Sequence, residues 1–343
     1  MQNDDFVYNP RISNLAPYGP INRNKTGYTG IISPLYYVFR VLNINTAFIE
    51  WYFKTTCWHK FMYQHGDSGA RSDRFSIKDN ELKKLPIKLP ADDMEQEKIA
   101  KTLTSLDNTL QLHERKYEEL TIIKQALLQK LFPKKDEIKP EVRYENFSDA
   151  WEQRKLVSLF SKFTDGDWIE SKDQANTGIR LIQTGNIGIT EFINKFGNEK
   201  WISEETFKKL NCEEIFPGDI IISRLPDPAG RACILPKLDT RMITAVDCTI
   251  ARTSRETSAE FIVQYLSTQT YFKYVQSCLA GGTRQRISRK NLANFNVSIP
   301  TEINEQKQIG FFFKQLDTLI ALHQCKLEKL KQLKKFLLQN MFI

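Results

Sequence analysis

The clearest pattern in the chain is a set of apolar residues that recur in alternating steps of four and three. It occurs twice, in residues 95–132 and in residues 305–342, and the two stretches align without a gap at an offset of 210 residues. This heptad spacing places the apolar side chains in one narrow stripe, as in helices that wrap around each other. Each stretch of 38 residues predicts a helix, about 57 Å long at a rise of about 1.5 Å per residue.

So narrow a stripe cannot be buried by a lone helix, and each helix therefore needs a partner. The other helix is the first candidate, and packing of each helix against its own neighbouring domain is the alternative. The residues that we expect to form the pairing stripe are Leu103, Leu106, Leu110, His113 and Leu120 in the first helix and Phe313, Leu316, Ile320, His323 and Leu330 in the second.

Two histidines, His113 and His323, occupy equivalent positions on the two stripes. A metal ion would need further ligands, and no carboxylate or cysteine lies at ligand spacing beside either histidine. Polar residues on such a stripe more often fix the register of the paired helices. The sequence therefore predicts no metal site, and it gives no sign of a cofactor.

The segments before the two helices also correspond. Residues 151–300 contain short apolar runs separated by glycine and proline, which indicates a mixed sheet with helices around it. Residues 1–90 match only the later part of this domain, because Asp5 aligns with Asp219 and the residues from Phe48 align with those from Phe261. By this register about 60 residues of the first domain are absent, and the loss should expose a sheet edge.

The chain thus divides into five parts. They are a partial first domain (1–90), the first long helix (91–133), a charged linker that we expect to be exposed (134–150), a second domain (151–300) and the second long helix (301–343). The predicted fold class is α/β with mixed α+β character. A duplication at so long a period indicates repeated domains and excludes a solenoid of short repeats.

Composition bounds the partners and the compartment. The net charge is +8 and the pI is about 9.0, which suits a polyanionic partner but is shared by many proteins without one. The six scattered cysteines form no Cys-x-x-Cys pair, and they indicate buried thiols in a reducing compartment. We expect a cytoplasmic protein without membrane contact, because the start is polar and no apolar run approaches the roughly 20 residues of a membrane helix.

Motifs that carry catalysis are missing from the sequence. It contains no phosphate-binding loop, dinucleotide-binding turn, zinc-protease helix or nucleophile elbow. Pro226-Asp227 lacks the acidic-x-lysine that would complete a metal-nuclease motif, and Asn9-Pro10-Arg11 lacks the second proline and the aromatic ring of an adenine methyltransferase. We therefore predict that the chain is not itself an enzyme.

Basic segments precede both long helices. Arginine binds a phosphate or a guanine edge with two hydrogen bonds, and glutamine can bind adenine. The alternative is that each segment is only a solvated basic loop. Because a basic segment recurs in both halves, nucleic-acid binding is favoured. The candidate DNA-binding residues here are Arg71, Arg74 and Lys78 in the first half and Thr283, Arg284, Gln285, Arg286, Arg289 and Lys290 in the second.

The earlier part of the second domain offers a weaker set of candidates. Polar and apolar residues are interleaved in residues 180–187, which on a strand would direct one set to an open face. Two further arginines follow an apolar run and a Pro/Gly turn, where a solvated role is the alternative. These candidates are Arg180, Gln183, Thr184, Asn186, Arg224 and Arg231.

Together these motifs resemble the specificity subunit of type I restriction–modification systems. The resemblance covers essentially the whole chain, and the order of the motifs with a duplicated helix is its specific feature. The residues that carry it are DAWEQRKL (149–156), RLIQTGNI (180–187), FPGDIIISR (216–224), GGTRQRIS and the closing Ile-Pro (281–300), residues 5–40, and the two long-helix stretches.

The resemblance implies two target-recognition domains, each reading one half of a split site in double-stranded DNA. It implies that the two helices pair antiparallel and set the distance between the half-sites. It also implies docking of methyltransferase subunits and of ATP-driven restriction subunits, whose complex methylates adenine and cleaves DNA in bacterial defence.

The incomplete first domain departs from the family pattern. It leaves open whether the chain is a truncated or rearranged product, or obtains the missing piece from another chain such as a second specificity chain. A scaffold that recruits proteins through its helices without binding specific DNA is the alternative function.

Overall fold

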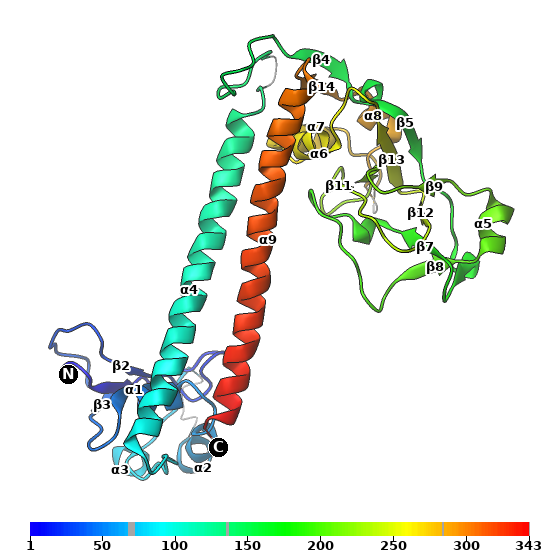
Figure 1. Ribbon diagram of the computed structural model, residues 1–343. Helices are drawn as coiled ribbons and strands as arrows, with labels where there is room; N and C mark the ends of the chain where they lie inside the picture. Colours follow the sequence, from blue (N-terminus) through cyan, green and yellow to red (C-terminus); the bar gives the residue numbers. More distant parts are fainter. Residues whose placement is uncertain (68–72, 135–136, 283–284, 343) are drawn as a thin grey trace. The chain divides into compact units, whose positions relative to one another are not determined.

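The computed structural model describes the chain except for residues 68–72, 135–136, 283–284 and 343. It divides into two compact units, one formed by residues 1–117 with 322–343 and the other by residues 118–321. Two long helices, α4 (Asp93–Lys130) and α9 (Ile303–Asn340), each contribute to both units. Within each unit their stretches lie side by side and run in opposite directions (Figure 1). The predicted antiparallel helix pair is confirmed.

Three sheets are present in the described residues of the second unit. In the first, β4 (Glu152–Lys155) pairs with β14 (Asn296–Ile299). The four-stranded sheet has the order β11-β10-β13-β5 and the five-stranded sheet the order β6-β8-β7-β12-β9. Because β7 and β12 are parallel and their other neighbours antiparallel, the larger sheet is mixed, as predicted. The strands of these two sheets are β5 (Phe160–Asp165), β6 (Gln174–Ala175), β7 (Ile179–Ile182), β8 (Lys200–Ile202), β9 (Glu214–Ile215), β10 (Ile220–Ser223), β11 (Ala232–Ile234), β12 (Met242–Thr244) and β13 (Cys248–Thr253).

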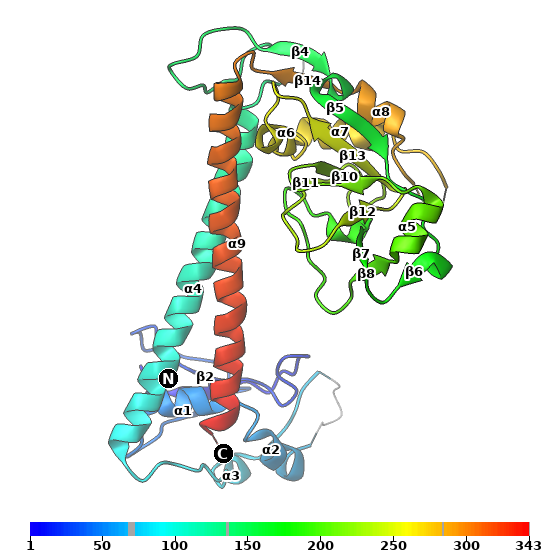
Figure 2. The ribbon, with the colours of Figure 1, turned by 45° about the vertical axis from the view of Figure 1, so that its right-hand side comes forward.

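Short helices surround these sheets, as Figure 2 shows from a second direction. Several begin at a serine or threonine whose side chain accepts a hydrogen bond from a backbone amide of the first turn, which stabilises a helix start. They are η1 (Leu156–Leu159), η2 (Ser171–Asp173), η3 (Thr184–Asn186), α5 (Glu204–Leu210), α6 (Ala259–Tyr265), α7 (Gln269–Ser277) and α8 (Arg289–Asn294). The largest core cluster joins Trp151, Phe261 and Tyr271 to Phe132 and to Phe313 of α9.

The first unit repeats the later half of the second. Its strands β1 (Phe6–Tyr8), β2 (Ile21–Arg23) and β3 (Tyr37–Phe39) have the order β2-β1-β3, which matches β11-β10-β13. The helices α1 (Thr46–Phe53), α2 (His59–His65) and α3 (Asp79–Leu82) follow in the places of α6, α7 and α8. Among the described residues no strand pairs with the outer edge of β3, whereas β5 pairs with β13. The predicted open edge is therefore present.

Polar contacts repeat along with the elements. Asp5 accepts a hydrogen bond of 2.7 Å from Arg40 Nε, and Asp219 binds Arg252 through two bonds of 2.8 Å. Gln96 of α4 accepts from the backbone amide before α1, and Gln306 of α9 does the same before α6. The first domain therefore shares polar contacts as well as topology with the later half of the second.

The linker is exposed over most of its described residues, as expected, but it is anchored at one point. Arg143 donates two hydrogen bonds of 2.7 and 2.8 Å to the carboxylate of Glu305, whose side chain is 1% exposed. Trp151 donates a third bond from Nε1 to the same carboxylate. No helix in the described part of the chain is long and apolar enough to cross a membrane.

Candidate nucleic-acid interface

The basic segment before α9 leads into α8 as an anchored, exposed strip. Ile287 is fully buried, and its amide donates to the carbonyl of Arg224. On either side of this anchor, Gln285, Arg286 and Lys290 are exposed. Thr283 and Arg284, which belong to the same prediction, lie outside the described residues. The fold thus fixes the backbone of the strip while its cationic side chains reach the solvent.

Two carboxylates, which sequence reasoning missed, lie beside these cations. Arg286 Nη1 is 3.8 Å from Asp247 Oδ1, and Arg289 Nε is 3.8 Å from Asp165 Oδ2. Exposed pairs of this length contribute about 0–1 kcal/mol. A phosphate can therefore replace the carboxylates at little loss in free energy, so the arginines stay available for an anion.

Two other candidate arginines lie inside the second unit. Arg180 is 2% exposed, donates to Asn194 Oδ1 at 3.4 Å and stacks over the ring of Trp201. Its burial lowers the pKa of the guanidinium. Arg224 is 8% exposed and donates to the carbonyl of Val246 at 2.6 Å. DNA contact by these two side chains stays a prediction, and their present contacts are within the protein.

Arg231 connects two loops of the second unit. Its guanidinium donates to the carbonyls of Thr184 and Ile187 in one loop and of residues 225, 226 and 228 in the other. The buried Asn186 accepts from the amide of Gln183 and donates to the carbonyl of Ile193. Arg231 and Asn186 therefore hold the loop that carries the half-buried Gln183 and Thr184.

The first unit has a related basic segment. Arg74 is half-buried and forms an antiparallel backbone bridge with the exposed Arg11, a neighbour that sequence reasoning did not identify. Lys78 is exposed and directly precedes α3, as Ser288 precedes α8. Arg71 lies outside the described residues. In both units the basic segment therefore leads into a short helix.

Exposed aromatic rings were also missed from the sequence. Trp168 is 68% exposed after β5, and Phe196 is 82% exposed between η3 and β8. The sequence signal for them was a large aromatic residue within a polar loop, because aromatic rings are usually buried in a core. Both lie in the part of the second unit that has no counterpart in residues 1–90.

The pairing stripe is covered along the two helices. Leu103 and Phe313 are fully buried in the core clusters of their units, together with the end of the opposite helix. Both packing alternatives therefore hold, because these residues contact the other helix and a sheet domain. The remaining stripe residues are buried (Leu106, Leu110, Leu120) or half-buried (His113, Leu316, Ile320, His323, Leu330).

Ion pairs between α4 and α9 follow the repeat. In the first unit Asp107 pairs with Lys334, and in the second unit Asp317 pairs with Lys124. Each residue lies 210 positions from its counterpart in the other pair. In the first pair α4 therefore supplies the aspartate and α9 the lysine, and in the second pair α9 supplies the aspartate and α4 the lysine. Asp317 also accepts hydrogen bonds from Gln264 Nε2 at 2.7 Å and from Thr190 Oγ1 at 2.9 Å. These contacts fix the register that the apolar stripe alone leaves loosely specified.

The two stripe histidines meet, with 2.9 Å between their Nδ1 atoms. At this distance one nitrogen donates and the other accepts, so at least one ring is neutral. Burial lowers the pKa of His323, and the nearby His113, Lys326 and Lys116 lower it further. Among the described residues no group of three or more potential metal ligands occurs.

We expect acid to weaken the first unit through this histidine pair. The pKa of His323 is lower in the folded chain than in the unfolded chain, so the unfolded chain binds the proton first. The free energy of unfolding should therefore fall as the pH drops through about 6.5. Thermal unfolding at pH 8 and pH 5.5 should show a larger loss of Tm for the native chain than for His323→Gln, and equal losses would contradict the prediction.

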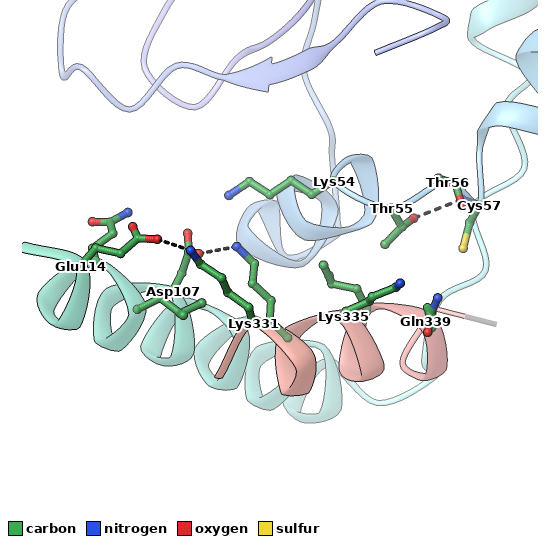
Figure 3. Close-up of a pocket in the computed structure, with 13 residues that line it drawn as sticks. Lys54, Thr55, Thr56, Cys57, Asp107, Glu114, Lys331, Lys335 and Gln339 are labelled. Carbon is green, nitrogen blue, oxygen red and sulfur yellow. Dashed lines mark hydrogen bonds and ion pairs between the residues drawn. The ribbon is translucent and has the colours of Figure 1, made fainter. Parts of the chain in front are cut away.

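A groove in the first unit runs where the end of α1 meets both long helices (Figure 3). It has a volume of about 610 Å³ and is lined by Lys54–Cys57, by Asp107 and Glu114 of α4, and by Lys331 and Lys335 of α9. Lys331 pairs with Glu114 at 2.8 Å along its wall.

The second unit has a groove of about 540 Å³ at the corresponding place. Ser267–Thr270 take the position of Lys54–Cys57, and Gln125, Leu128 and Gln129 of α4 take the positions of Lys335, Leu338 and Gln339 of α9. The repeat therefore gives the two grooves one corresponding wall, whereas Asp107 and Glu114 complete the first groove and Phe132 and Phe272 complete the second.

Comparison with known proteins identifies relatives of this arrangement. The family model described as "Type I restriction modification DNA specificity domain" matches residues 12–121 and 148–332. The MjaVIII specificity subunit of a type I restriction enzyme from Methanocaldococcus jannaschii is 24% identical over 260 residues, which cover 73% of this chain and 60% of the relative. The putative MjaX specificity subunit of the same organism is 26% identical over 267 residues, covering 76% and 59%. The chain thus spans about 60% of the length of these curated relatives.

Solved structures share the fold. A type I restriction–modification S subunit from M. genitalium aligns with a TM-score of 0.65 and 15% identity, covering 100% of this chain and 84% of that chain. The HsdS subunit from Thermoanaerobacter tengcongensis aligns with a TM-score of 0.51 and 16% identity, covering 100% and 81%. A chain from a study of complex assembly in the type I system aligns with a TM-score of 0.54 and 16% identity, covering 100% and 82%.

Proposed function

The chain belongs to the type I restriction–modification DNA specificity family, and we propose that it reads DNA sequence for a restriction–modification complex without catalysing a reaction itself. The observation that carries the proposal is the strip around Ile287, where a buried anchor holds Gln285, Arg286 and Lys290 at the surface. A fixed backbone with exposed donors is what base reading requires, because hydrogen-bond discrimination depends on position.

Affinity and selectivity would come from different groups. Arg289 and Lys290, at the start of α8, suit phosphate contacts, which position a protein on the duplex and weaken with salt. Gln285 and Arg286, which precede the buried Ile287, suit base edges. In the absence of DNA, Asp247 would pair with Arg286 and Asp165 with Arg289.

Partner docking is the second part of the proposal. The two grooves share one corresponding wall, formed by residues 54–57 in the first unit and 267–270 in the second, and this wall would contact the same kind of partner in each unit. We assign them to the two methyltransferase subunits, with ATP-driven restriction subunits joining for cleavage. A solved structure from work on complex assembly of the type I restriction–modification system shares this fold, which is consistent with docking of partner subunits.

Mapping of methylated adenines would test the function directly. Co-expression of the chain with methyltransferase subunits should methylate one sequence-defined set of sites in the host genome. Methylation without sequence preference would contradict the proposal. Negligible affinity for any duplex at low salt, with the partners present, would instead favour a scaffold that recruits proteins only.

A further inference from the structure

One continuous segment of the second unit occupies three positions that are open in the first. This closing segment, Arg143–Asp165, contains the anchoring Arg143 and Trp151, the strand β4, the turn η1 and the strand β5. Since the strands and short helices of the first domain match those in the later half of the second, the second domain shows what would cover each open position of the first.

The first open position is a carboxylate. Glu305, near the start of α9, is buried beneath Arg143 and Trp151. Its counterpart 210 residues earlier is Glu95, near the start of α4. Glu95 is exposed, and no ion pair joins it to another described residue. The same carboxylate thus lacks the two side chains that cover it in the second domain.

The second open position is the segment 86–89, which corresponds to the strand β14 of the second unit. In β14, Val297 and Ile299 are 0% and 3% exposed, and they pair with residues of β4. The counterparts in the first unit are Ile87, which is half-buried, and Leu89, which is 39% exposed. No described strand pairs with residues 86–89. An apolar segment of strand sequence is therefore left without its partner.

The third open position is the outer edge of β3. Phe39 pairs with Phe6 as Ala251 of β13 pairs with Ile220, which places the two edges in the same register. Ala251 and its neighbours pair on the other side with residues 162–165 of β5. The residues of β3 are half-buried, whereas the first four residues of β13 are buried.

We infer that the first domain binds a polypeptide segment from outside residues 1–343 that carries an arginine and a tryptophan followed by two strands around a 3₁₀ turn. The segment would cover Glu95, residues 86–89 and β3 as Arg143–Asp165 covers their counterparts, with backbone hydrogen bonds to residues 86–89 and to β3. A second copy of the chain is a poor donor, because Trp151, Leu156 and Leu159 are buried in their own unit. The inference does not rest on DNA binding.

Hydrogen exchange in the full chain would test this inference. One sample contains the chain together with a free peptide of residues 141–166. The other sample is a fusion variant in which residues 141–214 precede Met1, because residue 215 is the counterpart of Met1 in the repeat. We expect exchange of the Tyr37–Phe39 and Ile87–Leu89 amides to slow by about tenfold or more. Unchanged exchange in both samples would overturn the inference.

A matched pair of variants distinguishes this contact from general stickiness. Glu95→Ala should weaken peptide binding about tenfold, because it removes the carboxylate for a charge-assisted contact. Glu97→Ala, at an exposed position of the same helix turn, should leave binding unchanged. Equal effects of the two changes would count against the inference. Protection of β3 that rises with concentration of the chain alone would show a second copy as the occupant, and would also overturn it.

Discussion

Replacing Phe132 with alanine is expected to lower the free energy of unfolding of the second unit by about 3–5 kcal/mol. Phe132 follows the end of α4 and is 3% exposed. Its ring packs against Trp151, Phe261, Tyr265 and Phe313, with centroids 5.3–6.4 Å apart. Removing it leaves a cavity at the point where the helix, the linker and the sheet domain meet. Denaturant titration combined with hydrogen exchange would measure the loss unit by unit.

The repeat supplies the comparison for this experiment. Phe342, which follows the end of α9, packs against Phe48 and Tyr52, so Phe342→Ala should weaken the first unit in the same way. Phe336 is 60% exposed on the same helix, and Phe336→Ala should change stability by about 0.5 kcal/mol or less. A loss below about 1 kcal/mol for Phe132→Ala would show that the core can collapse around the missing ring.

The long helices could be predicted closely because their signal is local and repeated. The heptad pattern placed them at residues 95–132 and 305–342, and they are observed at Asp93–Lys130 and Ile303–Asn340. The alignment also predicted that residues 1–90 correspond to the later part of the second domain, and β1 and β10 are observed in matching places. The apolar stripe does not identify polar partners, so the Asp107–Lys334 and Asp317–Lys124 pairs emerged only from the structure.

The candidate site was harder to predict, because strand alternation does not hold for a covered strand. All four residues of β7 are buried, so Arg180 lies inside although it alternates with apolar neighbours. Arg231 follows a turn, where solvent exposure is usual, yet its five carbonyl acceptors come from two loops. Asp165 and Asp247 approach the basic strip from distant positions in the sequence, and no local pattern marks such contacts.

Removal of three cations from the strip should produce the largest loss of DNA binding. In the complex with its methyltransferase partners, the triple change Arg286→Ala, Arg289→Ala and Lys290→Ala is expected to weaken target binding about 100-fold at low salt. Each lost phosphate contact should also reduce the slope of log K against log salt by about 0.9. Titration of target and random duplexes at several salt concentrations would measure both effects.

A second triple variant separates a local site from general charge. Lys208 and Lys209 of α5 and Lys237 between β11 and β12 are exposed in the same unit, and their replacement by alanine removes the same charge from elements other than the strip. Because exposed charges beyond about 10 Å are largely screened at 0.1 M salt, this control should bind the target nearly as the native chain does. Equal losses in both variants would show that the strip only adds to the overall positive field. Native affinity in the first variant would remove the strip from the DNA interface.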